Sequence, residues 1–341
     1  MTILGTEPPN FEIAPSGHKI EPSSHRADTM ALDIASVAIH PSVDAVFPPA
    51  VLEHELADVP IPVVAIDDDP SELENGDAIV TFSYREWFLE RAAWIHSIQS
   101  GVDRFPFDDL REASIALTNS TGIHGESVGE TVTGYMLSIA RRLHRHRWNQ
   151  QHRRWDRPAW DDPFTLNGEL VTIVGLGTLG QGVAQRASAL EMIVHGVRRD
   201  STPVDGVENL YGPNELEAAV TDARFVVSTL PLTEATENFF DAAVFNNMRA
   251  DGYFINVGRG GLVDEPALID ALESGHIAGA ALDVFETEPL PVDSPLWEME
   301  SVIITPHTAA QTRDYYRDIA EIVRDNIERV TAGEPLYNRV M

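Results

Sequence analysis

One short segment, residues 171–180, limits the folds open to this chain more than any other. It reads Val-Thr-Ile-Val-Gly-Leu-Gly-Thr-Leu-Gly, a β-branched run that opens into a G-x-G-x-x-G pattern. In a strand–turn–helix unit, Gly175 allows the tight turn, Gly177 lets backbone approach a phosphate, and Gly180 lets helix and strand pack closely. The N–H groups that begin the helix then bind the anion. The segment therefore predicts a dinucleotide site, in which Thr178 and Leu179 complete the turn. A chance glycine pattern is the alternative, and the strand before it and helix after it argue against chance.

Two consecutive arginines, Arg198 and Arg199, follow the next apolar run, residues 193–197. At this place an NAD site has an acid that hydrogen-bonds the ribose 2′-OH. A guanidinium there suits a 2′-phosphate instead. We therefore expect NADP(H) to be the preferred cofactor, with NAD(H) also possible.

Apolar runs alternate with helical stretches along the whole chain and form two series. Such alternation predicts parallel sheets with helices on both faces. The first series of expected strands is 34–39, 63–66, 78–82, 94–98 and 115–117. The second is 171–174, 193–197, 225–228, 253–256, 280–284 and 302–305, and six strands fit a dinucleotide fold. Helices are expected over 126–143 and 309–330, where the apolar residues have helical spacing.

We expect an α/β protein of two doubly wound parallel-sheet domains, a Rossmann cofactor domain inserted in a flavodoxin-like substrate domain. The cofactor domain is 126–309. The substrate domain combines 30–125 with 310–341, because the last helix comes too late for the six-strand unit. Residues 1–29, with scattered prolines and charges, are expected to be disordered, or Met30 is the real start of translation.

The charge balance is extreme: 54 acidic residues oppose 24 basic ones, the net charge is −30, and Lys19 is the only lysine. Such a surface repels itself unless salt screens it. Thermophiles enrich lysine together with glutamate, so heat adaptation does not explain the pattern. We interpret it as adaptation to a cytoplasm of very high salt, with ordinary acidic variation as the alternative. An acidic surface disfavours nucleic acid and anionic membranes as partners.

Several classes of protein are excluded by what the chain lacks. It has no cysteine, which rules out disulfides, thiolate catalysis and cysteine-bound metals, and no metal site is expected. No apolar run approaches the ~18 residues of a membrane span. The first 29 residues lack the apolar core of a signal peptide, so a cytoplasmic location is expected.

Residues 141–157 contain seven arginines and three histidines in this otherwise acidic chain. A nucleic-acid stripe is one interpretation, but no nucleic-acid-binding motif accompanies it. A contact between subunits is the second. The third is a helix whose cations lie near its C-terminal dipole and pair with nearby acids. We favour the last two.

Three further segments place a polar residue just beyond the carboxyl end of a buried strand, where doubly wound sheets bind ligands. They are residues 255–272, 279–290 and 302–307. Reduction of a 2-keto acid needs a cation for the carboxylate, a proton donor and a partner that keeps the donor charged. Arg259, His307 and Glu288 supply these in turn. Glu286 competes with Glu288 for the histidine, while His307 and Arg259 could each be structural.

Taken together, these motifs resemble those of the D-isomer-specific 2-hydroxyacid dehydrogenase family. The resemblance covers residues 78–307 and is strongest after 171. It includes the segment Pro-Leu-Thr-Glu-Ala-Thr at 231–236 and the Asn-Val-Gly-Arg-Gly run that contains Arg259. The lysine-poor composition is similar to that of haloarchaeal members.

The resemblance implies roles for individual residues. Arg259, Glu288 and His307 would be the catalytic triad, with Glu288 preferred over Glu286 because it precedes proline as in the family. Ser100 and Gly101 would donate backbone N–H groups to the substrate carboxylate, and Asp283 would meet the nicotinamide carboxamide. Further cofactor contacts would be made by Leu230, Pro231, Thr236, Val257, Gly258, Arg259 and His307.

The implied activity is reversible reduction of small 2-keto acids to D-2-hydroxy acids by a homodimer joined through its cofactor domains. A glyoxylate/hydroxypyruvate reductase, a phosphite-type dehydrogenase and a non-catalytic NADP(H)-binding sensor are the alternatives. Formate oxidation is disfavoured, because Glu288 stands where that subgroup has glutamine. Val257 and Gly258 replace the small polar or alanine pair common in the family, which affects packing. The first 77 residues match poorly, so the pocket for the substrate side chain is not assigned.

Overall fold

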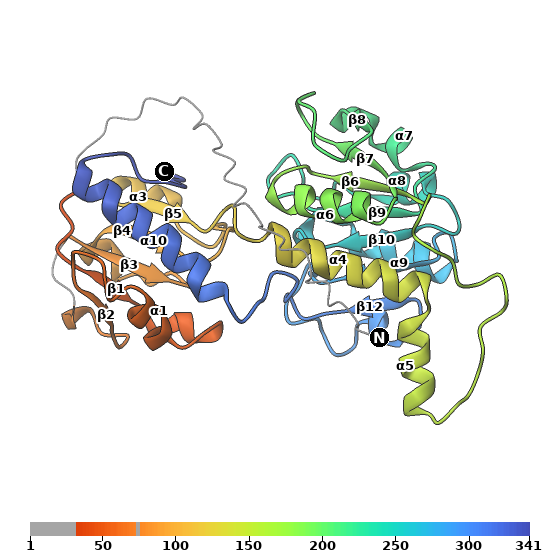
Figure 1. Ribbon diagram of the computed structural model, residues 1–341, viewed down its shortest axis with the longest axis horizontal. Helices are drawn as coiled ribbons and strands as arrows, with labels where there is room; N and C mark the ends of the chain where they lie inside the picture. The colour runs from red at the N-terminus through yellow and green to blue at the C-terminus, as the bar shows by residue number, and fades with distance from the viewer. Residues whose placement is uncertain (1–31, 73–75) are drawn as a thin grey trace, which may run out of the picture.

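The computed structural model describes residues 32–72 and 76–341. It has two lobes, each built around a parallel sheet and joined by two crossings of the chain (Figure 1). The expectation for residues 1–29 and Met30 lies outside the described residues. The predicted fold class, α/β with two doubly wound parallel sheets, is confirmed.

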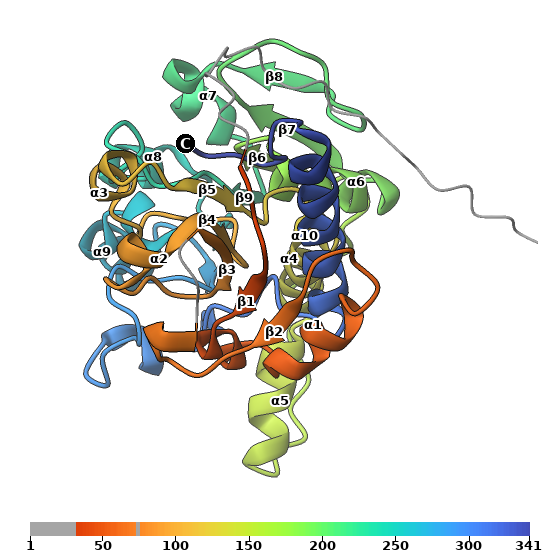
Figure 2. The same cartoon turned by 90° about the vertical axis from the view of Figure 1, so that its left-hand side faces the viewer.

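The first sheet has the strand order β2-β1-β3-β4-β5, and every pairing is parallel. This 2-1-3-4-5 order is the flavodoxin-like arrangement. Its strands are β1 Val37–Ile39, β2 Val63–Ala65, β3 Asp77–Thr81, β4 Ala92–Ser97 and β5 Ala116–Asn119. Helices α1 (Pro49–Glu55) and α10 (Tyr315–Ala332) cover one face, while α2 (Phe88–Arg91) and α3 (Phe107–Glu112) cover the other. Figure 2 shows α10 lying alongside α1 in this lobe.

The second sheet has seven strands in the order β12-β11-β10-β9-β6-β7-β8, again all parallel. Its strands are β6 Leu170–Val174, β7 Ile193–Val197, β8 Asn209–Tyr211, β9 Phe225–Ser228, β10 Tyr253–Asn256, β11 Gly279–Leu282 and β12 Val302–Ile304. Helices α7 (Leu216–Val220), α8 (Ala242–Asn247) and α9 (Glu265–Glu273) cover one face. Helices α4 (Gly125–Ala140) and α6 (Thr178–Ala189) cover the other.

The expected count of six strands was wrong, because β8 was missed. Strands β6 to β11 follow the 3-2-1-4-5-6 order of a dinucleotide fold with β8 as its third strand, and β12 is an added seventh. β8 is a three-residue edge strand that pairs only with β7, and none of its residues is buried. A strand with so little buried surface leaves no apolar run to detect.

The two expected long helices have different bounds in the structure. The stretch expected over 126–143 is α4 followed, after Arg142 in a left-handed conformation, by the separate helix α5 (Leu143–Gln151). The helix expected from 309 begins at Tyr315, since the preceding residues form a loop at the site described below. α5 has no buried residue and projects from the second lobe in both views (Figures 1 and 2). None of the helices in the described ranges has the length and hydropathy needed to cross a membrane.

Candidate active site

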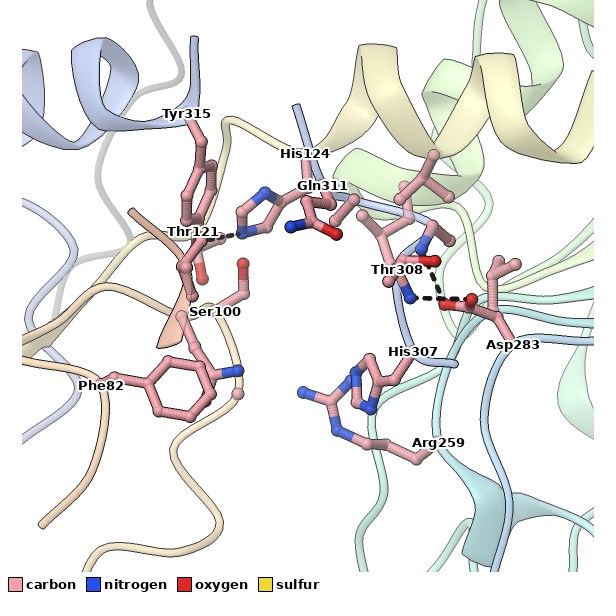
Figure 3. Close-up of a pocket in the computed structure, with 18 of the residues that line it drawn as sticks. Phe82, Ser100, Thr121, His124, Arg259, Asp283, His307, Thr308, Gln311 and Tyr315 are labelled. Atoms are coloured by element: carbon pink, nitrogen blue, oxygen red, sulfur yellow. Dashed lines mark hydrogen bonds between the residues drawn. The ribbon is translucent and has the colours of Figure 1, made fainter. Parts of the chain in front are cut away.

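A cavity of about 510 Å³ lies between the lobes and is lined by both of them (Figure 3). The first lobe contributes the loop after β4, which includes Ser100 and Gly101. The second lobe contributes Arg259, Glu288 and His307 from the segments after β10, β11 and β12. Carboxyl ends of parallel strands meet at one edge, so the sheet brings these distant segments together.

The His307 and Glu288 side chains form a direct pair. His307 Nδ1 lies 2.8 Å from Glu288 Oε2, and each side chain is about one-third exposed. Burial acts to raise the pKa of Glu288, but the hydrogen bond and charge of His307, the backbone N–H of Phe285 and the charge of Arg104 outweigh it. The pKa of Glu288 is therefore lowered, and the carboxylate is ionised at neutral pH. With Nδ1 occupied, Nε2 is the ring nitrogen left for a ligand.

Asp283 fixes the loop that carries His307. Its buried carboxylate accepts hydrogen bonds from the Thr305 hydroxyl at 2.6 Å and from the backbone N–H groups of Thr308 and Ala309, each at 2.9 Å. The backbone N–H of His307 donates to the Asp283 carbonyl at 2.8 Å. His307 has φ +54°, a left-handed conformation that is uncommon for residues other than glycine, so these bonds hold an otherwise unfavourable turn. Asp283 also lines the cavity, as a nicotinamide-contacting residue would.

Arg259 reaches across the cavity to the loop of the first lobe. A Cβ atom added to Gly101 would lie 1.8 Å from its Nη2 atom, so the guanidinium occupies the space that a side chain at 101 would fill. Arg259 Nη1 donates to the Gly258 carbonyl at 2.8 Å, and its Nε lies 3.8 Å from Asp103 Oδ1. The structure thus brings Arg259, His307 and Glu288, from three separate motifs, to one cavity with Ser100 and Gly101, which the family resemblance implied.

The glycine motif has the backbone geometry that a pyrophosphate requires. Gly175 has φ +99°, and a Cβ at Gly180 would lie 1.9 Å from the Gly175 carbonyl oxygen. Gly177 precedes α6 with nothing within 4 Å of the Cβ position, so its face is open to a ligand. Thr178 and Leu179 begin α6 and line the cavity, which joins the helix N-terminus to the catalytic residues.

The remaining residues predicted to contact the cofactor lie along the same edge, mostly outside the cavity. Leu230 packs over Gly175 and Gly258, the Thr236 hydroxyl donates to the Pro231 carbonyl at 2.7 Å, and Val257 lines the cavity. Arg198 and Arg199 follow β7. The Arg198 guanidinium donates to Asp200 Oδ2 at 2.7 Å and to the Thr202 carbonyl at 3.0 Å.

Sequence reasoning missed part of the cavity wall. His124, at the start of α4, stacks on Tyr315, at the start of α10, and its Nε2 lies 3.4 Å from the tyrosine hydroxyl. Burial, reinforced by the charge of Arg259, lowers the pKa of His124 to about 4, so the imidazole is neutral at neutral pH. The carboxyl-end rule could have indicated His124, which follows β5. Other wall residues that were missed include Phe82, Thr121 and Gln311, which Figure 3 labels, and Arg104.

The chain is similar to known proteins both in sequence and in fold. The family of D-isomer-specific 2-hydroxyacid dehydrogenases, NAD-binding domain, matches residues 133–309. A glyoxylate/hydroxypyruvate reductase B of an Enterobacter species is 36% identical over 249 residues, which are 72% of this chain and 76% of that protein. A D-isomer-specific 2-hydroxyacid dehydrogenase family protein of Aeromonas salmonicida has a TM-score of 0.78 at 30% identity, covering 91% of this chain and 99% of the other.

A second solved structure holds a ligand. It is an NADPH-dependent glyoxylate/hydroxypyruvate reductase of Sinorhizobium meliloti in complex with NADP and sulfate. Its TM-score is 0.76 at 28% identity, and the match covers 90% of this chain and 98% of the other.

Proposed function

The chain belongs to the family of D-isomer-specific 2-hydroxyacid dehydrogenases and is an oxidoreductase, and from this premise we propose that it reduces small 2-keto acids to D-2-hydroxy acids. We propose NADPH as the preferred reductant and NADH as a possible one. The observation that carries the proposal is the His307–Glu288 pair, 2.8 Å long, which lines the same cavity as Arg259. The names of the similar proteins favour glyoxylate and hydroxypyruvate as members of the substrate class.

Different residues of the chain would bind the substrate and transfer the proton. Arg259 and the backbone N–H groups of Ser100 and Gly101 bind the substrate carboxylate and orient the keto carbon. His307, hydrogen-bonded to the ionised Glu288, gives the Nε2 proton to the carbonyl oxygen as the carbon is reduced. NADPH, when bound, would supply the hydride for the new C–H bond and would itself be oxidised to NADP⁺. In the reverse direction His307 accepts the hydroxyl proton.

The cofactor would bind along the carboxyl edge of the second sheet. Its pyrophosphate fits the open backbone of Gly177 and the N-terminus of α6. Arg198 and Arg199 would meet the 2′-phosphate, and Asp283 the nicotinamide carboxamide. We propose the domain division accordingly: residues 126–309 bind cofactor, while 30–125 with 310–341 complete the substrate pocket.

We also propose a homodimer joined through the cofactor domains. Helix α5 and the loop after it expose large aromatic side chains, with Trp155 93% and Trp160 94% exposed. Apolar surface of this kind favours a protein partner over water. The arginines of the same segment make the acidic surface of a second copy a suitable partner.

The test is a panel of 2-keto acids assayed with NADPH and NADH at high and low salt, for the wild type and a His307→Ala variant. We expect reduction by the wild type and a loss of kcat of ~10²–10⁴-fold in the variant, with the nucleotide still binding. A His307→Ala enzyme that keeps most of its kcat would refute the proton-donor role. Nucleotide binding without turnover of any substrate would favour a sensor, and turnover of phosphite would favour that alternative reaction.

A further inference from the structure

Arg104 forms no ion pair with any described carboxylate, although the chain is rich in carboxylates. Acids outnumber bases 54 to 24, and most arginine side chains form ion pairs or hydrogen bonds. We define the arm as residues 143–157. Outside the arm, Arg104 and Arg199 are the arginines of the described chain whose guanidinium groups have neither an ion pair nor a hydrogen bond. Arg199 belongs to the proposed 2′-phosphate site, whereas Arg104 makes no direct contact in the mechanism above and acts there only through its charge on Glu288.

The position of Arg104 is at the wall of the active-site cavity. It follows the Ser100–Gly101 loop, and the guanidinium carbon lies 5.8 Å from the centre of the Phe82 ring, which lines the same cavity. A cation over an aromatic face is held by the ring's quadrupole, so the guanidinium is placed there without being neutralised. The side chain is exposed, so its charge is available to a molecule entering the cavity.

The cavity wall therefore contains two cationic side chains, Arg259 and Arg104, and apolar side chains near them. Arg259, which lies against Gly101, is the cation that would bind the carboxylate next to the keto group. Arg104 is the second, and Ala45, Val46 and Phe82 supply apolar wall nearby. A substrate whose carboxylate is bound at Arg259 would extend its remaining carbons along apolar wall. A negative group at the far end of a short chain would then meet Arg104.

We propose that Arg104 is a substrate-binding residue that selects 2-keto acids carrying a second anionic group, a carboxylate or a phosphate. This inference rests on the proposed function and narrows its substrate class. Glyoxylate and hydroxypyruvate remain substrates, because they need only Arg259 and the loop N–H groups. The second anion adds a charge-assisted contact that uncharged side chains of equal length cannot make.

The experiment compares pairs of substrates matched in chain length at saturating NADPH: oxaloacetate with 2-oxobutyrate, 2-oxoglutarate with 2-oxovalerate, and 3-phosphohydroxypyruvate with hydroxypyruvate. The site should favour either a carboxylate or a phosphate as the second anionic group. For that group, we expect the wild-type kcat/KM of the doubly charged substrate to exceed the kcat/KM of its matched partner by about tenfold or more, as a charge-assisted contact allows. Arg104→Gln should remove this ratio, whereas a change in the charge felt by Glu288 should alter kcat/KM equally for both members of a pair. Arg104→Lys should keep part of the ratio. The first two pairs report a carboxylate and the third a phosphate.

Arg111→Gln is the matched control, since Arg111 is an exposed arginine of the same lobe that pairs with Asp108 and does not line the cavity. The inference would be overturned if the ratio of kcat/KM between the two substrates of a pair were the same in the wild type and in Arg104→Gln. An equal loss for every substrate, glyoxylate included, would also overturn it, by showing that Arg104 serves the His307–Glu288 pair. If the wild type reduces no keto acid with either nucleotide, the proposed function itself fails.

Discussion

At the scale of single residues, the partners of the arginines decide what each one can bind. Among the described carboxylates only Asp103 forms an ion pair with Arg259, at 3.8 Å, so the charge of Arg259 is available in the cavity. Arg198 is held by Asp200 at 2.7 Å, and hydrogen bonds from Thr202 and Arg198 lower the pKa of that carboxyl to about 2. Arg199 has no such partner among the described residues. The two adjacent arginines are therefore not equivalent.

This difference leads to a prediction about the cofactor. Replacing Arg199 by glutamine should weaken NADPH binding about tenfold or more, as expected for loss of a charge-assisted contact, and change NADH binding little. Arg198→Asp should also weaken NADPH more than NADH. Dissociation constants from nucleotide fluorescence titrations would measure both, with Arg249→Gln as a control on an arginine paired to Asp251. An equal loss for the two nucleotides would contradict the assignment of this site to a 2′-phosphate.

At the scale of elements, the contact between α4 and α6 joins the crossing between lobes to the helix of the glycine motif. The two backbones touch through glycines: a Cβ at Gly182 would lie 1.9 Å from the Gly125 carbonyl oxygen, and one at Gly129 would lie 2.5 Å from the Gly182 carbonyl oxygen. Backbone cannot move aside as a flexible side chain does. The position of α6, and so of its N-terminus, depends on these glycines.

Gly182→Ala tests this contact. The added methyl group should destabilise the protein by about 1–3 kcal/mol through overpacking. Gly134→Ala is the control within α4, because Gly134 is exposed and has nothing within 4 Å of its Cβ position. Removing a helical glycine there should stabilise by roughly 0.5–1 kcal/mol. Urea unfolding of the variants would measure both changes. If Gly182→Ala were as stable as the wild type, α4 and α6 could move apart to accept the methyl group, and the prediction would be wrong.

At the scale of the whole molecule, the net charge of −30 is carried by two lobes that line one cavity. Five of the arginines lie in the arm and two, Arg104 and Arg259, line the cavity, while acidic residues outnumber basic ones 54 to 24 in the chain as a whole. Mutual repulsion of these acids opposes the compact state unless ions screen it. Salt is therefore expected to matter for stability.

We predict that the thermal unfolding midpoint rises by several degrees when KCl is increased from about 0.1 M to about 2 M, because the Debye length falls to a few ångströms. Sucrose of equal osmolality is the control, since it is excluded from the surface without screening charge. Calorimetry in the two series would separate the effects. A midpoint that does not depend on KCl would favour ordinary acidic variation over adaptation to salt.

The sequence by itself determined local features: the glycine turn, the buried apolar strands, and the polar residues at strand ends. Such features depend on the neighbouring residues of one segment, so they predicted the fold class and the residues that gather at the cavity. The edge strand β8 was missed, because its pairing with β7 and not its own burial holds it.

Only the tertiary structure decided which distant groups meet. It placed His124 and Tyr315 in the cavity wall, Asp283 under the His307 loop, and Arg104 beside the loop that Arg259 touches. These relations join residues from different strands and from both lobes, and no spacing along the chain encodes them. They arise because parallel strands bring their carboxyl ends to one edge, and because the two crossings of the chain set one edge against the other.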